Sequence, residues 1–210
     1  MTFIVTITLL LLAGGLPTAL IVFFSRKTMI HRFHELAKET GLNFALPKRK
    51  NILKNPKPAL VGDYKNRLVN MTTQTKDNIP FTEIAMSCNT RWTADFEAKS
   101  PFKENYIYNF LYESKFKPML TGDSIFDEHF FIKVTEKEAI ELFNVKVRKF
   151  LLSHYQNINL QIEIRGYEIV VNDSNLSNSD KAEAGIVANT VYMLDFMTQL
   201  ANLLEQKRLA

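Results

Sequence analysis

A long stretch without charges near the N-terminus constrains this chain more than any other feature. The segment "FIVTITLLLLAGGLPTALIVFF", residues 3–24, contains 22 residues, and none of them is charged. At about 1.5 Å of rise per residue, a helix of this length spans about 33 Å, enough for a hydrocarbon core of roughly 30 Å. Glycine and proline inside it are tolerated in membrane helices. We therefore expect a transmembrane helix here.

The alternative for this segment is a cleaved secretory signal peptide. Such a peptide starts with basic residues, has a shorter apolar run and ends in small residues. Here the two residues before the run, "MT", are uncharged, and the residues after it, "SRK", are basic rather than small. The pattern favours an uncleaved anchor over residues 1–25.

The positive charge of the chain gathers beside this segment. Residues 26–67 hold eleven Lys and Arg against three acids, whereas residues 68–210 hold fifteen against nineteen. Basic residues next to a membrane helix mark its cytoplasmic side. We therefore expect a single-pass protein of the bacterial inner membrane, with its N-terminus outside and its C-terminal domain in the cytoplasm. The single cysteine, Cys88, fits a reducing compartment and excludes an internal disulfide.

These basic residues have two open interpretations, because they either bind anionic lipid headgroups or only set the topology. The set is Arg26, Lys27, Arg32, Lys48, Arg49, Lys50, Lys54 and Lys57. Its central part, "PKRKNILKNPK", lacks the aromatic residues of single-strand nucleic-acid binders. We expect the lipid bilayer as a partner and no nucleic acid.

The rest of the chain predicts an α+β fold, a soluble domain of mainly antiparallel strands with two packed helices. Hydrophobic periodicity and turn residues give the elements. Strands are expected within residues 59–75 around a turn at Lys65–Asn66, then at 81–89, 105–114 and 129–135, with a hairpin at 159–173 and a loop at 91–104. Helices are expected at 25–40, 135–156, where Thr135 and Glu138 form a capping box, and 180–207. The domains are 1–25 anchor, 26–58 basic juxtamembrane helix and linker, and 59–210 cytoplasmic domain.

The stretch "TGDSIFDEHFFIKV", residues 121–134, raises the question of catalysis. Gly-Asp-Ser opens a known hydrolase signature, and His129 follows Ser124 by five residues. No third residue is spaced to orient that histidine. We interpret the stretch as a turn followed by a strand that starts at Ile125, and we assign no catalytic, cofactor or metal residues and no cofactor.

Aromatic residues are unusually dense between residues 106 and 131. Tyrosine is enriched in protein interfaces. These side chains either pack in the core or form a partner surface, and the candidates for such a surface are Tyr106, Tyr108, Tyr112 and Phe116.

Two short motifs resemble an uncharacterised family of bacterial single-pass, membrane-anchored domains of unknown function. They are "GDYKNR" at Gly62–Arg67 and "GDSIFDEHFFIKV" at Gly122–Val134. The resemblance implies a bacterial envelope protein, and it transfers no functional residue.

These observations lead to one expected function and two alternatives. We expect a non-enzymatic, membrane-anchored accessory, scaffold or assembly subunit of a larger membrane protein complex. The alternatives are a membrane-tethered hydrolase that uses Ser124 with His129 or His154, and a module that binds anionic lipid surfaces.

Overall fold

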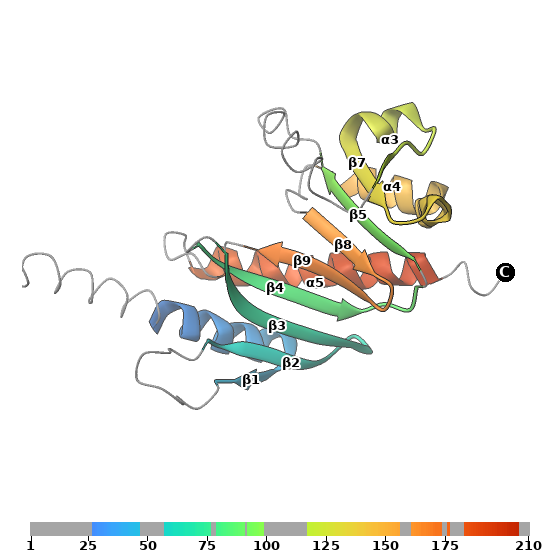
Figure 1. Ribbon diagram of the computed structural model, residues 1–210. Coiled ribbons are helices and arrows are strands. Elements are labelled where there is room, and N and C mark those ends of the chain that lie inside the picture. The colour runs from blue at the N-terminus through green and yellow to red at the C-terminus, as the bar shows by residue number, and fades with distance from the viewer. Residues whose placement is uncertain are drawn as a thin grey trace, which may run out of the picture.

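The protein is built on one nine-stranded antiparallel sheet with the order β1-β2-β3-β4-β9-β8-β5-β7-β6 (Figure 1). The computed structural model describes residues 27–46, 57–76, 79–90, 92–98, 117–155, 161–173, 176 and 183–205. The strands are β1 (Asn43–Ala45), β2 (Ala59–Tyr64), β3 (Arg67–Lys76), β4 (Ile79–Ser87), β5 (Thr93–Ala98), β6 (Lys117–Met119), β7 (Phe130–Val134), β8 (Gln161–Arg165) and β9 (Glu168–Asp173). Some neighbouring strands, such as β4 and β9, are far apart in sequence. The sheet therefore depends on contacts between distant parts of the chain.

Helices cover one face of this sheet (Figure 1). The helices are a segment over residues 27–40, α3 (Ser124–His129), the short 3-10 helix η1 (Lys137–Leu142), α4 (Val145–His154) and α5 (Glu183–Glu205). α5 crosses the middle of the sheet, where the Thr198 hydroxyl lies 3.6 Å from the Met86 sulfur on β4. α4 packs on α5 through stacked rings of Phe150 and Phe196, whose centroids are 5.2 Å apart.

Alternation along the strands explains why the described helices lie on this face. In β4, Thr82, Ile84 and Met86 are buried, whereas the residues between them are partly exposed. The register places Ile84 opposite Met71 on β3 and Val171 on β9, so the apolar side chains of neighbouring strands share one face. Burial of one such side chain contributes about 1.5–3 kcal/mol. The helices are therefore held on by the core that this face forms.

The helix over residues 27–40 belongs to this core. Phe33 and Leu36 are fully buried in it. Gly41 ends the helix with φ of +73°, a conformation that glycine adopts readily, and its N–H donates to the Ala37 carbonyl at 2.9 Å. β1 follows at once and pairs with β2. The structure therefore joins residues 27–45, expected as juxtamembrane helix and linker, to the domain that was expected to start at residue 59.

The membrane part of the fold-class prediction is corrected by the structure. No helix within the described residues is both long enough and apolar enough to cross a membrane. The longest, α5, has 23 residues but carries Asp195 and Glu205 and covers the sheet. The segment predicted as the span, residues 3–24, lies outside the described residues. The fold is an α+β arrangement of a large antiparallel sheet with helices, more of them than the two that were expected.

Three local predictions were wrong, and each has a physical reason. Residues 124–129 form α3 rather than a strand, because the Asp123 side chain caps the helix by accepting from the Phe126 N–H at 3.2 Å. The helix expected over 135–156 is broken before α4, because the Asn144 side chain accepts from the Lys146 and Val147 N–H groups and starts a new helix. β5 replaces a predicted loop because β8 and β7 pair with it on both sides.

Several other predictions are confirmed. The β2–β3 and β8–β9 hairpins, β4, β7 and α5 lie where the periodicity placed strands and a helix. The strand expected at 105–114 lies outside the described residues.

Replacement of Leu36 by alanine tests whether residues 27–40 belong to the core. Since the side chain is fully buried, Leu36→Ala should lower the free energy of unfolding by about 2–5 kcal/mol. Urea denaturation of the full chain measures this change. Glu39→Ala, an exposed position on the same helix, should stay within about 0.5 kcal/mol of the parent. Equal, small effects of both changes would show that this helix does not contribute to the core.

Candidate functional site

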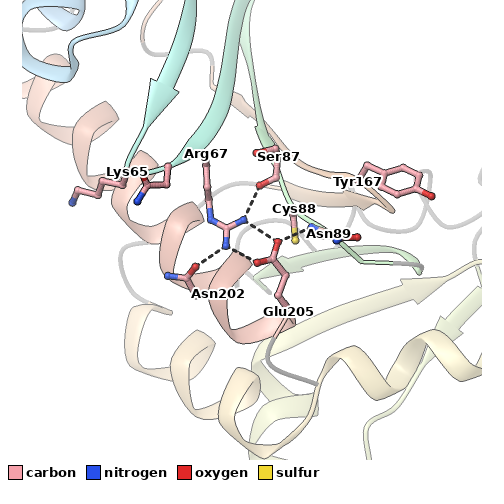
Figure 2. A pocket seen from close by; sticks show the side chains of 9 residues that line it. Lys65, Arg67, Ser87, Cys88, Asn89, Tyr167, Asn202 and Glu205 are labelled. Carbon is pink, nitrogen blue, oxygen red and sulfur yellow. Dashed lines mark hydrogen bonds and ion pairs between the residues drawn. The ribbon is translucent and has the colours of Figure 1, made fainter. Parts of the chain in front are cut away.

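A polar cleft lies at one end of the sheet, where two hairpin turns meet the end of α5 (Figure 2). Its volume is about 610 Å³, within the usual range for ligand sites. The cleft is lined by Lys65, Asn66, Arg67, Ser87, Cys88, Asn89, Tyr167, Asn202 and Glu205. We call this set the hairpin cleft.

A bidentate ion pair between Arg67 and Glu205 lies at the centre of the hairpin cleft (Figure 2). Arg67 Nη1 lies 2.9 Å from Glu205 Oε1, and Nη2 lies 2.8 Å from Oε2. The same guanidinium donates to the Ser87 carbonyl at 2.9 Å and to Asn202 Oδ1 at 2.6 Å. The bond to Glu205 raises the pKa of Arg67. With its side chain only 10% exposed, Arg67 joins the start of β3 to the last turn of α5.

Local backbone geometry positions these groups. β2 and β3 are joined by Lys65 and Asn66, which both have positive φ, +49° and +64°. Two such residues form the tight hairpin turn whose twist matches that of the strands. The turn brings Arg67 back toward α5 directly after β2. Just after the neighbouring strand β4, the Asn89 N–H donates to Glu205 Oε1 at 2.7 Å. Three chain segments therefore meet at one carboxylate.

A second contact ties the same hairpin to α5 at Asp195, ten residues before Glu205 in that helix. The Tyr64 hydroxyl donates to Asp195 Oδ1 at 2.6 Å, and the Lys65 ammonium pairs with the same oxygen. Burial and the bond to Asp195 raise the pKa of Tyr64. Partial burial opposes ionisation of Asp195, but the bonds from Lys65 and Tyr64 outweigh it and lower the pKa of that carboxyl. The hairpin is thus fixed to α5 at two places.

Cys88 lies in the floor of the hairpin cleft. Its side chain is 2% exposed. Burial, with a smaller contribution from the negative charge of Glu205, raises the pKa of the thiol to about 12. Because the thiolate is the nucleophile and the metal ligand, this cysteine is protonated and inert at neutral pH.

The stretch that suggested a hydrolase forms a rigid helix cap instead. Asp127 accepts from the Thr121 and Gly122 N–H groups at 2.9 and 3.0 Å. Asp123 accepts from Arg148 Nε at 3.0 Å. Hydrogen bonds to the Phe126 N–H and to Arg148 lower the pKa of Asp123. Asp127 therefore joins α3 to the turn that precedes it, and Asp123 joins the start of α3 to α4.

The proposed serine and histidines are not brought together. Ser124 starts α3 and His129 ends it, a rise of about 7.5 Å along the helix axis. His129 Nδ1 lies 2.8 Å from the Ile125 carbonyl oxygen, and His154 Nδ1 lies 2.9 Å from that of Phe150. Within the described part of the chain, no hydrogen bond joins Ser124 to either histidine.

The other predicted residues fall in different places. Arg32 is 1% exposed and lies inside the fold. Lys27 is exposed, and exposed Lys57 donates to the Thr75 hydroxyl at 2.6 Å. Outside the described residues lie Arg26, Lys48, Arg49, Lys50, Lys54, Tyr106, Tyr108, Tyr112 and Phe116. Their roles stay predictions. Across the described ranges, no group of three or more His, Cys, Asp or Glu side chains is placed to hold a metal ion.

Sequence reasoning missed the hairpin cleft. Its central ion pair joins Arg67 to Glu205, 138 positions later in the chain. Lys207 and Arg208 follow Glu205 closely in the sequence, so the acid by itself did not indicate a cation from elsewhere in the fold.

Comparisons with known proteins show what this fold is similar to. No protein-family model matches the chain, and no curated protein matches it either. Among solved structures, it is similar to the crystal structure of the mycobacterial trehalose monomycolate transport factor A, TtfA. The likeness has a TM-score of 0.54 and 12% sequence identity, and it covers 86% of this chain and 96% of that one. At this identity, the likeness shows a shared fold.

Replacement of Arg67 by lysine tests the contribution of the bidentate ion pair with Glu205 to stability. Arg67→Lys keeps the charge but loses the planar fork, so we expect the free energy of unfolding to fall by about 2 kcal/mol. Urea denaturation gives the value. The matched control is Arg165→Lys, because Arg165 pairs with acids on the open face of the sheet and is 38% exposed. That change should cost at most about 1 kcal/mol, and a larger cost there than at Arg67 would contradict our description.

Labelling of Cys88 tests the state of its thiol. With a pKa of about 12, about one thiol in ten thousand is ionised at pH 8. We expect iodoacetamide to leave the folded chain unmodified for hours at pH 8 and to modify it fully in urea. Mass spectrometry of the intact chain measures the modified fraction. Rapid modification without urea would mean that the thiol is accessible and ionised.

Proposed function

We propose that this protein is a non-enzymatic accessory protein and that it acts by binding a partner protein at the hairpin cleft. The proposal rests on how the side chains of the cleft are used. The groups capable of chemistry there, Arg67, Glu205 and Cys88, are held in internal contacts or buried. Such a site is rigid and suited to recognition rather than to reaction.

The observation that carries the proposal is the exposure of Tyr167 on the rim of this rigid cleft. Tyr167 lies between β8 and β9 and is 79% exposed, and it points away from the ion pair (Figure 2). Its backbone is fixed, because the Tyr167 carbonyl accepts from the Cys88 N–H at 2.8 Å. Rigid, exposed tyrosines are frequent anchors of protein interfaces.

The shared fold supports an accessory role in a transport process. The similar structure, TtfA, is a transport factor by its title. We propose that this chain likewise serves a transport machinery, through contact with one of its protein components. As a finer proposal, that component is part of an integral membrane complex.

Affinity purification of the full-length chain from its own cells tests the proposal. We expect a companion protein in stoichiometric amount, released by Tyr167→Ala. Removal of an interface anchor costs about 2 kcal/mol, which corresponds to a roughly thirtyfold loss of affinity. Quantitative mass spectrometry of the purified material measures the ratio of companion to chain. Membrane spans in the companion's complex would support the finer proposal, and their absence would refute it.

Ile125→Ala is the matched control, because Ile125 is also a large exposed side chain, 62% exposed, but lies on α3. It should leave the companion bound. A companion retained by Tyr167→Ala, or purification without any stoichiometric companion, would contradict the proposal.

A further inference from the structure

We propose that the outer face of the sheet, next to Tyr167, binds a segment of the partner protein that carries basic side chains beside apolar ones. The outer face is the one opposite the described helices. This inference rests on the proposed function, because Tyr167 is the anchor named there, and it adds the chemistry of the partner. It is carried by an excess of negative charge on that face and by two exposed aliphatic side chains near it.

Three carboxylates surround one guanidinium on the outer face. Arg165 Nη2 lies 2.9 Å from Glu163 Oε2, which is a hydrogen-bond distance. The oxygens of Glu83 and Glu168 lie further from that guanidinium, at 3.8 and 3.6 Å. We call these four residues the Arg165 group. One positive and three negative charges leave the group with an excess of two negative charges, although the whole chain has a net charge of +4.

The Arg165 group is open to solvent. Arg165 is the last residue of β8, Glu83 lies on β4, and β9 runs between these two strands (Figure 1). An ion pair from β8 to β4 therefore places the guanidinium over the outer side of β9. The side chains of the group are between 29% and 41% exposed. A cation from a partner thus reaches the carboxylates without displacing Arg165.

Two large aliphatic side chains lie on the same face of the neighbouring strands. Leu68 on β3 is 56% exposed, and Val61 on β2 is 41% exposed. The residues next to them, Val69 and Leu60, are buried in the core, so Leu68 and Val61 point away from the helices. Val61 pairs with Asn70, two positions along from Leu68. They are diagonal neighbours, about 7–8 Å apart.

One strand separates Leu68 from the turn that carries Tyr167. The Leu68 N–H donates to Ser87 Oγ at 3.0 Å, and Ser87 pairs with Glu168, the residue after Tyr167. Because neighbouring strands are about 4.8 Å apart, Leu68 and Glu168 are about 10 Å apart across the sheet. About three residues of an extended segment span that distance. One short segment therefore reaches both the apolar anchors and the acids.

The sign of the charge selects the class of partner. Phosphates of nucleic acids or of anionic lipids would be repelled by the excess carboxylates, as would an acidic segment. A metal ion is a poorer match, because within the described residues no group of three or more His, Cys, Asp or Glu is placed to hold one. A partner's Lys or Arg adds a cation to the Arg165 group, and apolar side chains beside it cover Leu68 and Tyr167.

Titration of the full-length chain with model peptides tests the inference. The probe is the peptide acetyl-LSRSLSRSL-amide, which places Leu and Arg side chains on one face when it is extended, since every second side chain points the same way. Matched peptides carry Glu or Gln in place of both Arg residues. By isothermal titration calorimetry, we expect saturable binding of the Arg peptide, weaker binding of the Gln peptide, and a Kd at least about tenfold higher for the Glu peptide.

Variants locate the binding surface. Leu68→Ala should raise the Kd of the Arg peptide about fivefold through lost apolar contact. Glu168→Gln, which removes a charge at nearly constant shape, should raise it about threefold. The matched controls lie on α3: Ile125 is 62% exposed, and Glu128 is also exposed. Ile125→Ala and Glu128→Gln should leave the Kd unchanged. Circular dichroism checks that each variant is folded.

An Arg peptide that does not bind, or that binds no tighter than the Gln or Glu peptide, would overturn the inference. So would an unchanged Kd for Leu68→Ala or for Glu168→Gln. If the Arg peptide does not bind but Tyr167→Ala still releases a companion protein, the partner chemistry is wrong and the accessory role stands. If the Arg peptide binds at this surface and no companion co-purifies, the partner chemistry stands and the accessory role is wrong.

Discussion

The structure depends on the burial of one face of a single large sheet. Ile84 at its centre has Met71 and Val171 as neighbours on that face, and all three are fully buried. α5 and the helix over residues 27–40 supply the other half of the core. On the opposite face, Arg165 lies within 4 Å of Glu163, Glu83 and Glu168. The helices could not be moved to that face without exposing the core.

The hairpin cleft follows from this arrangement. α5 has to run along the sheet to cover it, and its last turn then lies beside the β2–β3 turn. The ion pair between Arg67 and Glu205 fixes the last turn of α5 against the β2–β3 turn. All four Nη hydrogens of the Arg67 guanidinium are donated in hydrogen bonds to Glu205, Asn202 and the Ser87 carbonyl. The cleft is rigid because the same contacts that hold α5 to the sheet form its floor. A change in the Arg67–Glu205 pair would therefore disturb both the cleft and the packing of α5 on the sheet.

Much of the fold could be predicted from local patterns, and the cleft could not. Alternation in β4, the turn at Lys65–Asn66 and the apolar stripe of α5 are local signals, and all three elements were placed correctly. β5 was missed because its short, mixed sequence becomes a strand only between β7 and β8. The Arg67–Glu205 pair joins residues 138 positions apart, and no local pattern encodes such a contact. The charge-free segment at residues 3–24 dominated the prediction, yet it lies outside the part of the chain on which the fold and cleft are described.

The strand order also determines at which point during synthesis the sheet can be completed. β4 receives its second neighbour, β9, only after more than eighty further residues have been made. Closing so long a loop is entropically costly and slows folding. During synthesis, the edge of β4 stays unpaired until β9 has been made. Glu205 is the last residue of the cleft to leave the ribosome. A ligand that needs the complete cleft would therefore bind only chains in which Glu205 has already been made.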